Sequence, residues 1–276
     1  MSDFQEFLEN SLQQKIKQLI PLTGGASADI NRIVLANEDE LIVRRTLSQE
    51  KSVMAIPKIL EAKIQKVVKK NGAPVPAIIF EFSEGEEIGE GYVMEAIPGE
   101  TIPRKILRDK KFASAREKLP FEIGKSLAKI HQTQLDDLKA LDQVTFSDSL
   151  GKLFQVYLSF NQPQPVFDLA FKWLEAQKLT EYGDVLVHGD FRFGNFIISE
   201  ENLESIIDWE LAHIGNPMED LGWLCVRSWR FGNVEKRVGG LGDIKDLIAG
   251  YESNSDIKID ESQLDIWQLY LSLIHI

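Results

Sequence analysis

The strongest constraint on this chain comes from short apolar runs that end in polar residues. The runs 185–187 and 196–198 flank a polar loop that contains Asp190 and Asn195, and Asp208 follows a third apolar run. Short runs rich in Val, Ile and Phe between polar turns are typical of buried strands. The sequence therefore predicts strands that hold three polar side chains at their ends.

These three side chains suit the transfer of a phosphoryl group. Asp190 is the candidate catalytic base, because a carboxylate near an acceptor hydroxyl accepts its proton. The oxygens of Asn195 and Asp208 are hard ligands of the kind that Mg²⁺ prefers. Turn formation alone would also explain Asp190 and Asn195, but the flanking strands favour a site. We predict a magnesium-dependent kinase that uses a nucleotide as phosphoryl donor.

Two other residues of this loop have candidate roles. Arg192 would steady negative charge on the acceptor or on the phosphates, so we predict it as a second catalytic residue; a solvated loop arginine is the alternative. His188 is expected to brace the loop or Asp208, since no histidine or cysteine cluster supports a zinc site. The missing histidine cluster also argues against a further alternative, a metal-dependent hydrolase built on His188, Asp190 and Asp208.

Composition narrows the class of protein. The chain has 276 residues, 43% of them hydrophobic, a formal net charge of −12 and one cysteine, Cys225. The acidic balance argues against non-specific nucleic-acid binding, and one cysteine allows no internal disulfide. The hydrophobic runs are too short to span a bilayer, and the N-terminus does not resemble a signal peptide. We therefore expect a cytoplasmic protein without nucleic-acid or membrane partners, and its oligomeric state stays open.

The pattern of apolar residues divides the chain near Pro98-Gly99. The expected elements before it are a helix over 3–20, strands over 30–36, 40–45, 77–82 and 91–96, a helix from Pro57 to Asn71, and an acidic turn over 83–90. The expected helices after it are 121–134, 150–160, 167–179 and 264–270. We predict an α+β protein with a nucleotide-binding lobe, 1–97, and a catalytic and acceptor-binding lobe, 98–276.

Candidate nucleotide contacts lie in the first lobe. The loop that contains Gly25 and Ser27 precedes the first strand, so its backbone N–H groups would cap the phosphates. Arg44 ends a predicted strand and would reach the α- and β-phosphates, and Glu61 on the next helix would hold it as an ion pair. Taken alone, these residues are better explained as a Gly-Gly turn, a surface arginine and a solvated glutamate, and only the downstream motif favours the nucleotide contacts.

The last six residues, Leu271–Ile276, end the chain without a cap or polar tail. One reading frame of a sequencing-library adapter would encode the same hexapeptide. We therefore expect the native sequence to end near Tyr270 and the protein to continue beyond it.

Together these motifs resemble the aminoglycoside phosphotransferase/choline kinase superfamily, which has a protein-kinase-like fold. The most specific part is His188-Gly-Asp190 with Asn195, followed by Ile206-Ile-Asp208-Trp209-Glu210. The segment 212–223, Ala-His-Ile-Gly-Asn-Pro-Met-Glu-Asp-Leu-Gly-Trp, is also typical of the family. The segment 225–232 resembles the branch found beside or fused to acyl-CoA dehydrogenases.

The resemblance implies a two-lobed fold with a small antiparallel-sheet N-lobe and a larger, mainly helical C-lobe. It implies Asp190 as base, Asn195 and Asp208 as magnesium ligands, and Glu61 as partner of the phosphate-binding cation. It also makes Met94, Glu95 and Ala96 the adenine-binding hinge and Asp220 a structural brace of the catalytic loop. Arg44 departs from the family, in which lysine is usual at this position, so the phosphate geometry must differ.

The branch points to a hydroxyacyl-CoA or hydroxy acid as acceptor. An aminoglycoside phosphotransferase that confers resistance and a catalytically silent nucleotide-binding module are the alternatives. Four aromatic residues would line an acceptor pocket or belong to the core: Trp223, Trp229, Tyr251 and Trp267. The sequence leaves the choice between ATP and GTP open.

Overall fold

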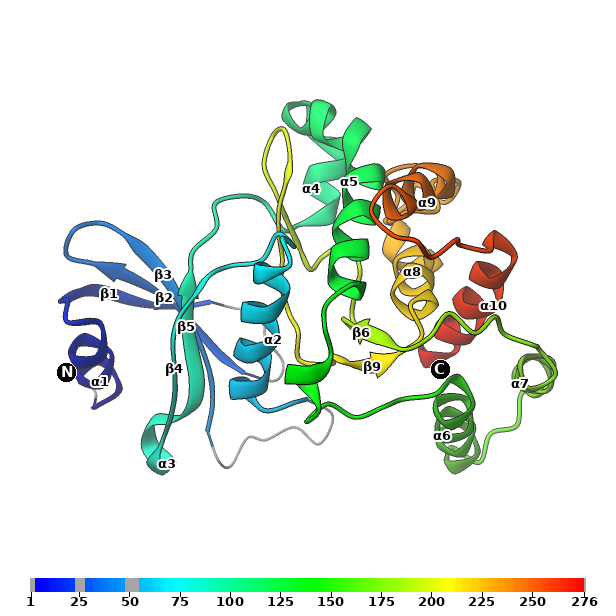
Figure 1. Cartoon of the computed structure of the whole chain (residues 1–276), viewed down its shortest axis with the longest axis horizontal. Helices are drawn as coiled ribbons and strands as arrows, with labels where there is room; N and C mark the ends of the chain where they lie inside the picture. The colour runs from blue at the N-terminus through cyan, green and yellow to red at the C-terminus, as the bar shows by residue number, and fades with distance from the viewer. Residues whose placement is uncertain (1–2, 23–27, 48–54, 276) are drawn as a thin grey trace.

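One antiparallel sheet of five strands organises the N-terminal part, in the order β1-β2-β3-β5-β4. The computed structural model describes residues 3–22, 28–47 and 55–275, and Figure 1 shows the sheet at one end of the molecule. The strands are β1 (Ile16–Pro21), β2 (Asp29–Leu35), β3 (Glu40–Thr46), β4 (Ile78–Glu84) and β5 (Gly89–Glu95). Their neighbours are α1 (Asp3–Leu12), α2 (Lys58–Lys70) and the single turn α3 (Gly85–Ile88).

The two faces of the sheet have different partners. Successive residues of a strand point to opposite faces. Val43 and Val93 are fully buried in an apolar cluster that includes Phe4 of α1. Their neighbours Arg44 and Tyr92, paired across β3 and β5, face the other way, towards α2. The sheet therefore carries an apolar core on one face and buried charge on the other.

The remainder of the chain is mainly helical. Its helices are α4 (Pro103–Arg108), α5 (Ala113–His131), α6 (Phe146–Ser159), α7 (Pro165–Glu175), α8 (Met218–Cys225), α9 (Ile244–Glu252) and α10 (Glu261–Ser272). Two small antiparallel pairs stand among them: β6 (Val185–Val187) with β9 (His213–Gly215), and β7 (Phe196–Ile198) with β8 (Leu203–Ile206). Figure 1 shows α6 and α7 at the end opposite the sheet.

Glycines allow α5 and α9 to cross closely. A Cβ on Gly124 of α5 would lie 2.1 Å from the Leu247 carbonyl oxygen, and a Cβ on Gly250 of α9 would lie 2.0 Å from that of Phe121. No other residue type fits there, so this contact fixes the centre of the helical core.

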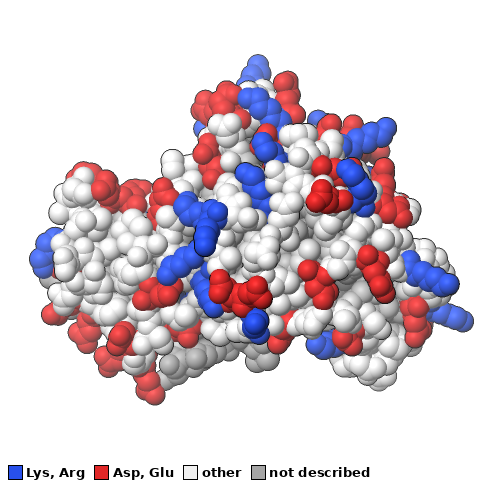
Figure 2. All heavy atoms as spheres, in the orientation of Figure 1, with Lys and Arg blue, Asp and Glu red and all other residues white. Residues whose placement is uncertain are grey.

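The surface mixes both signs of charge. Figure 2 shows Lys and Arg side chains interspersed with Asp and Glu over the face in view. Among the described residues, none of the helices combines the length and the apolar character that a bilayer crossing requires.

The predicted α+β class, with an antiparallel sheet and a mainly helical remainder, is confirmed. The predicted helix over 3–20 is wrong, because α1 ends at Leu12 and residues 16–21 form β1. Gln13 adopts a left-handed φ of 52°, and the Glu9 carboxylate accepts a hydrogen bond from the Ile16 amide at 3.2 Å. The chain therefore turns, and pairing with β2 overrides the helical spacing of Ile16 and the apolar residues after it.

Candidate active site

The loop between β6 and β7 presents Asp190 with its carboxylate already oriented. Arg192 Nε donates to both carboxylate oxygens at 3.0 Å, and Asn195 Nδ2 donates to Oδ2 at 2.6 Å. Trp223 Nε1 donates to Oδ1 at 2.7 Å. The Asp190 side chain keeps 16% of its surface exposed, so a substrate can reach it.

The backbone of this loop is fixed by Asp220 of α8. Its carboxylate accepts hydrogen bonds from the amides of His188 at 2.8 Å and Gly189 at 3.1 Å. His131 Nε2 lies 3.1 Å from the same carboxylate, and His131 Nδ1 lies 2.9 Å from the Tyr251 hydroxyl. Burial opposes ionisation of Asp220, but these hydrogen bonds outweigh it and lower its pKa. Asp220 therefore braces the loop, as the resemblance implies.

The His188 ring joins the loop to the segment that carries Asp208. Its Nε2 donates to the Ile207 carbonyl at 3.0 Å, and its Nδ1 accepts from the Asp190 amide at 3.2 Å. These two bonds require the neutral ring with its proton on Nε2. The ring also packs against Trp209, with centroids 4.5 Å apart. His188 is thus a brace, and its nitrogens are both in use.

The two candidate metal ligands flank a pair of strands, since Asn195 precedes β7 and Asp208 follows β8. The Ile207 amide donates to the Asn195 carbonyl at 2.9 Å, which brings Asp208 next to Asn195. Asp208 has a left-handed φ of 73°, unusual for a non-glycine residue. Its Oδ1 is buried and lies 2.7 Å from Arg44 Nη2, an ion pair that is its one polar contact among the described residues.

These donors fit Mg²⁺. Asn195 uses Nδ2 for Asp190, so its amide oxygen is the atom left for a cation. Among the described residues, no group of three His, Cys, Asp or Glu side chains surrounds a metal-sized space. Mg²⁺ commonly uses one or two protein oxygens and completes its shell with phosphates and water.

Buried charges join the sheet to the segment after β8. Arg44 Nε lies 3.4 Å from Glu61, and its Nη2 lies 2.7 Å from Asp208 and 2.5 Å from Glu210. Burial opposes protonation of Arg44, but Glu61 and the other acids outweigh it and raise its pKa. Arg44 therefore stays protonated, and the structure brings together the Arg44 and Glu61 pair predicted from sequence.

Sequence reasoning missed two members of this charge cluster. Lys58 of α2 is 2% exposed, ion-pairs with Glu61 and has its Nζ 3.9 Å from Glu210. Tyr92 also donates to Glu61, at 3.0 Å. Lys58 stands one helical turn before Glu61, and that spacing was the available signal. No local pattern pointed to the contact of Glu210 with Arg44.

Of the other predicted nucleotide contacts, the three hinge residues lie within the described residues and the two loop residues do not. Met94 and Glu95 end β5 and Ala96 follows it. The Glu95 amide already donates to the Ala77 carbonyl at 2.9 Å, so it is engaged within the protein and not with the predicted hinge contact. Gly25 and Ser27 lie outside the described residues.

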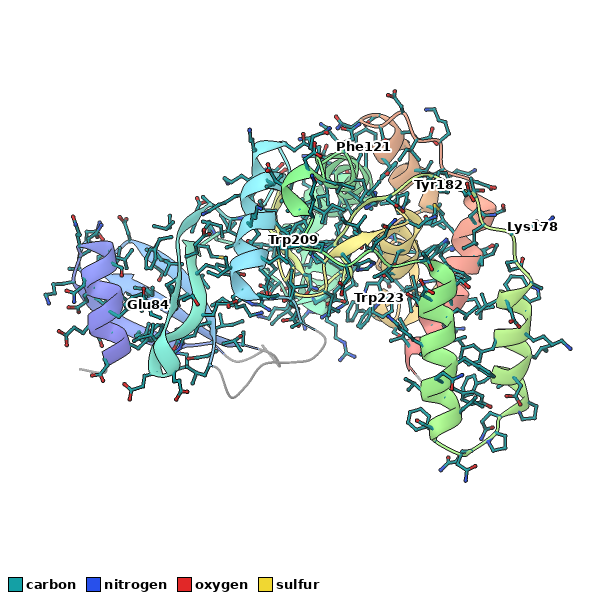
Figure 3. All side chains as sticks on the ribbon, turned by 60° about the horizontal axis from the view of Figure 1, so that its bottom comes forward. Glu84, Phe121, Lys178, Tyr182, Trp209 and Trp223 are labelled. Atoms are coloured by element: carbon teal, nitrogen blue, oxygen red, sulfur yellow. The ribbon has the colours of Figure 1, made fainter. Side chains whose placement is uncertain are left out.

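Two of the four predicted pocket aromatics lie beside Asp190. The Arg192 guanidinium stacks 4.7 Å from the Trp229 ring centroid, and the Trp223 and Trp229 rings meet edge to face at 5.3 Å. Figure 3 shows Trp223 and Trp209 in the middle of the molecule, between α2 and α6. Trp267 and Tyr251 are buried in the core, where the alternative reading put them.

Comparison with known proteins identifies the relatives of this chain. Mouse acyl-CoA dehydrogenase family member 10 is 26% identical over 238 residues, which are 77% of this chain and 21% of the mouse protein. Acyl-CoA dehydrogenase family member 11 of Pongo abelii is 27% identical over 235 residues, 77% of this chain and 29% of that protein. The chain thus spans less than a third of the length of these relatives.

Solved structures share the fold at low sequence identity. The GDP complex of aminoglycoside 2'-phosphotransferase-IIIa superimposes with a TM-score of 0.70 at 12% identity, over 99% of this chain and 89% of that one. Amicoumacin kinase in complex with AMP-PNP, Ca²⁺ and Ami gives 0.67 at 16% identity, over 99% and 84%. The kinase-like fold predicted from sequence is confirmed.

A family-level comparison covers most of the chain. The sequence profile of the phosphotransferase enzyme family matches residues 18–253, which include every described residue of the site. The chain therefore belongs to the phosphotransferase enzyme family.

Proposed function

We propose that this protein is a magnesium-dependent kinase that transfers the γ-phosphoryl group of ATP or GTP to a hydroxyl of a small molecule. The observation that carries the proposal is the 2.6 Å hydrogen bond from Asn195 to Asp190, which joins a base to a metal ligand. The strand that follows Asn195 pairs with the one that leads to Asp208. A base and two oxygen ligands thus meet at one hairpin.

In the proposed reaction, the acceptor oxygen bonds to the γ-phosphorus and the bond to the β,γ-bridging oxygen breaks. The hydroxyl proton passes to the Asp190 carboxylate, and a nucleoside diphosphate leaves. Asp190 is held by three side chains before substrate arrives, so little reorganisation is needed. Arg44 is the candidate cation for the α- and β-phosphates. Mg²⁺ on Asn195 and Asp208 would neutralise charge on the β- and γ-phosphates.

Two observations support a hydroxyacyl-CoA or hydroxy acid as acceptor. The curated relatives are named as acyl-CoA dehydrogenase family members. Arg192 uses Nε for Asp190 and, among the described residues, donates no hydrogen bond through its terminal nitrogens. These nitrogens would bind a carboxylate, thioester or phosphate next to the reacting hydroxyl. The same cation would repel a cationic aminoglycoside.

The experiment is a phosphoryl-transfer screen with Mg-ATP and Mg-GTP against hydroxyacyl-CoA thioesters, free hydroxy acids, kanamycin and choline. Asp190→Ala should reduce turnover by at least about 100-fold and leave nucleotide binding intact. Asp184→Ala is the matched control, because Asp184 is exposed and bonds only with Gln143 among the described residues. Near-normal turnover of Asp190→Ala, or a preference for kanamycin, would contradict the proposal.

A thermal-shift series separates a kinase from a catalytically silent nucleotide-binding module. Mg-ATP should raise the unfolding temperature more than ATP with a chelator, and Asp208→Ala should remove that difference. A silent module need not respond to the metal, so equal shifts would count against catalysis.

A further inference from the structure

One of the hydrogen bonds to Asp190 comes from outside its own loop. Trp223 lies 33 residues further along the chain, and its Nε1 donates to Asp190 Oδ1 at 2.7 Å. Arg192 and Asn195, the other side-chain donors, belong to the loop that carries Asp190. Trp223 thus ties the carboxylate to helix α8.

We infer that Trp223 is a positioning residue for phosphoryl transfer. The terminal torsion of an aspartate is broad, so a carboxylate plane held only by its own loop would sample several orientations. The indole N–H fixes Oδ1 and leaves the plane one orientation towards the acceptor hydroxyl. The inference rests on the proposed function, since it concerns how Asp190 acts in that reaction.

Helix α8 is a rigid support for this contact. Asp220 and Trp223 are three positions apart, so they lie on one face of the helix. Asp220 holds the backbone amides of the loop and Trp223 holds the carboxylate. A Cβ on Gly222 would lie 2.8 Å from Trp267 Cβ, so α8 packs tightly against α10. One helix face therefore fixes both the backbone and the reactive side chain of the loop.

The Trp223 ring is itself held in place. It meets the Trp229 ring edge to face at 5.3 Å, and the Arg192 guanidinium stacks on Trp229 at 4.7 Å. Because Arg192 also bonds to Asp190, the four side chains form a closed ring of contacts. Rotation of the indole away from Asp190 would break the contact with Trp229.

A pair of substitutions separates the N–H from the bulk of the ring. Glutamine and methionine have similar length and volume, but glutamine can donate a hydrogen bond at about the reach of the indole nitrogen. A hydrogen bond to a charged group contributes about 1.5–3 kcal/mol, or about 10- to 100-fold in rate. Trp223→Met should therefore lower kcat at least about 10-fold, with both KM values within about two-fold. Trp223→Gln should recover part of that loss.

A purely structural role makes the opposite prediction. Trp223 packs against the apolar core, so a packing role favours methionine over glutamine. Equal kcat values for Trp223→Met and Trp223→Gln, or a change in KM with kcat unchanged, would overturn the inference. Trp267→Phe is the matched control, because the Trp267 indole donates no hydrogen bond among the described residues and phenylalanine keeps the Cβ that contacts Gly222. Its kcat should stay near that of the unmodified chain.

A second measurement does not depend on activity. In NMR spectra, the indole N–H resonance of Trp223 is identified by its absence from Trp223→Met. This resonance should move upfield in Asp190→Ala, while the indole N–H resonance of Trp267 should not shift. A Trp223 resonance that ignores Asp190→Ala would overturn the inference and leave the proposed function standing. Absence of any phosphoryl transfer, even to water, would overturn the proposed function and with it the catalytic role of Trp223, although the resonance would still report the hydrogen bond.

Discussion

Arg44 Nη2 lies 2.7 Å from Asp208 Oδ1, so the candidate phosphate-binding cation is paired with a candidate metal ligand. The same guanidinium contacts Glu61 of α2 and Glu210. One side chain of the sheet therefore reaches both α2 and the segment after β8. In the proposed reaction, Asp208 would turn from Arg44 to the metal, and Arg44 would turn from Asp208 to the phosphates.

Arg44→Lys tests whether this planar group is required. Lysine keeps the charge, but a single ammonium cannot match the fork that contacts three carboxylates. We expect the nucleotide KM to rise about 10-fold, which corresponds to the loss of one charge-assisted hydrogen bond. Arg45→Lys is the control, since Arg45 points to the other face and pairs with Asp29 at 2.9 Å. An unchanged KM in Arg44→Lys would show that charge alone suffices.

Lys58→Met tests the buried part of the same charge cluster. Lys58 and Glu61 are both almost fully buried. Without Lys58, the Glu61 carboxylate keeps only Arg44 and Tyr92 as partners among the described residues. Complete loss of compensation costs about 3–5 kcal/mol, so we expect the free energy of unfolding to fall by somewhat less, about 2–4 kcal/mol. Lys66→Met removes another lysine of α2, from its exposed pair with Glu81 of β4, and should change the free energy of unfolding by less than about 0.5 kcal/mol. Urea unfolding measures the free energy of unfolding of both variants. Equal losses in Lys58→Met and Lys66→Met would contradict the argument from burial.

The local parts of the site could be predicted from sequence because they lie within one loop. Asp190, Asn195 and Arg192 stand five positions apart or less, and their hydrogen bonds follow from that proximity. The strands at 185–187 and 196–198 were also readable, because each is an apolar run next to a polar loop. These elements depend on short-range pattern alone.

The parts that could not be predicted depend on contacts between distant segments. Trp223 of α8 reaches Asp190 across 33 residues, and Glu210 reaches Arg44 from 166 residues away. Apolar spacing at 16–20 fitted a helix, but the backbone there pairs with β2. A single sequence gives no signal for such pairing, so tertiary contacts decided the structure.

Gly189→Ala tests the shape of the catalytic loop. Gly189 has a φ of 82°, and a Cβ there would lie 2.3 Å from the Leu211 carbonyl oxygen. Left-handed strain costs about 1 kcal/mol and the clash about 1–3 kcal/mol more, so we expect a large loss of both stability and turnover. Gly183→Ala is the matched control, because Gly183 has the same φ of 82° and nothing within 4 Å of its Cβ position. Gly183→Ala should lose only the free energy that the left-handed φ costs. Equal losses of unfolding free energy in the two variants, measured by urea unfolding, would contradict the steric argument.

The His213–Glu219 pair should make stability depend on pH. Burial lowers the pKa of His213, but the Glu219 carboxylate at 3.2 Å and the Leu211 carbonyl outweigh it and raise the pKa to about 9. Because the folded pKa lies above the unfolded value of about 6.5, the stabilisation is complete below pH 6.5 and is lost as the pH rises through 9. The free energy of unfolding of the unmodified chain should exceed that of His213→Gln by at most about 3 kcal/mol at pH 6, and the difference should shrink towards pH 10. Urea titrations at four pH values between 6 and 10 measure it. Groups other than this pair titrate alike in both proteins, so a difference that is constant or grows with pH would contradict the assignment.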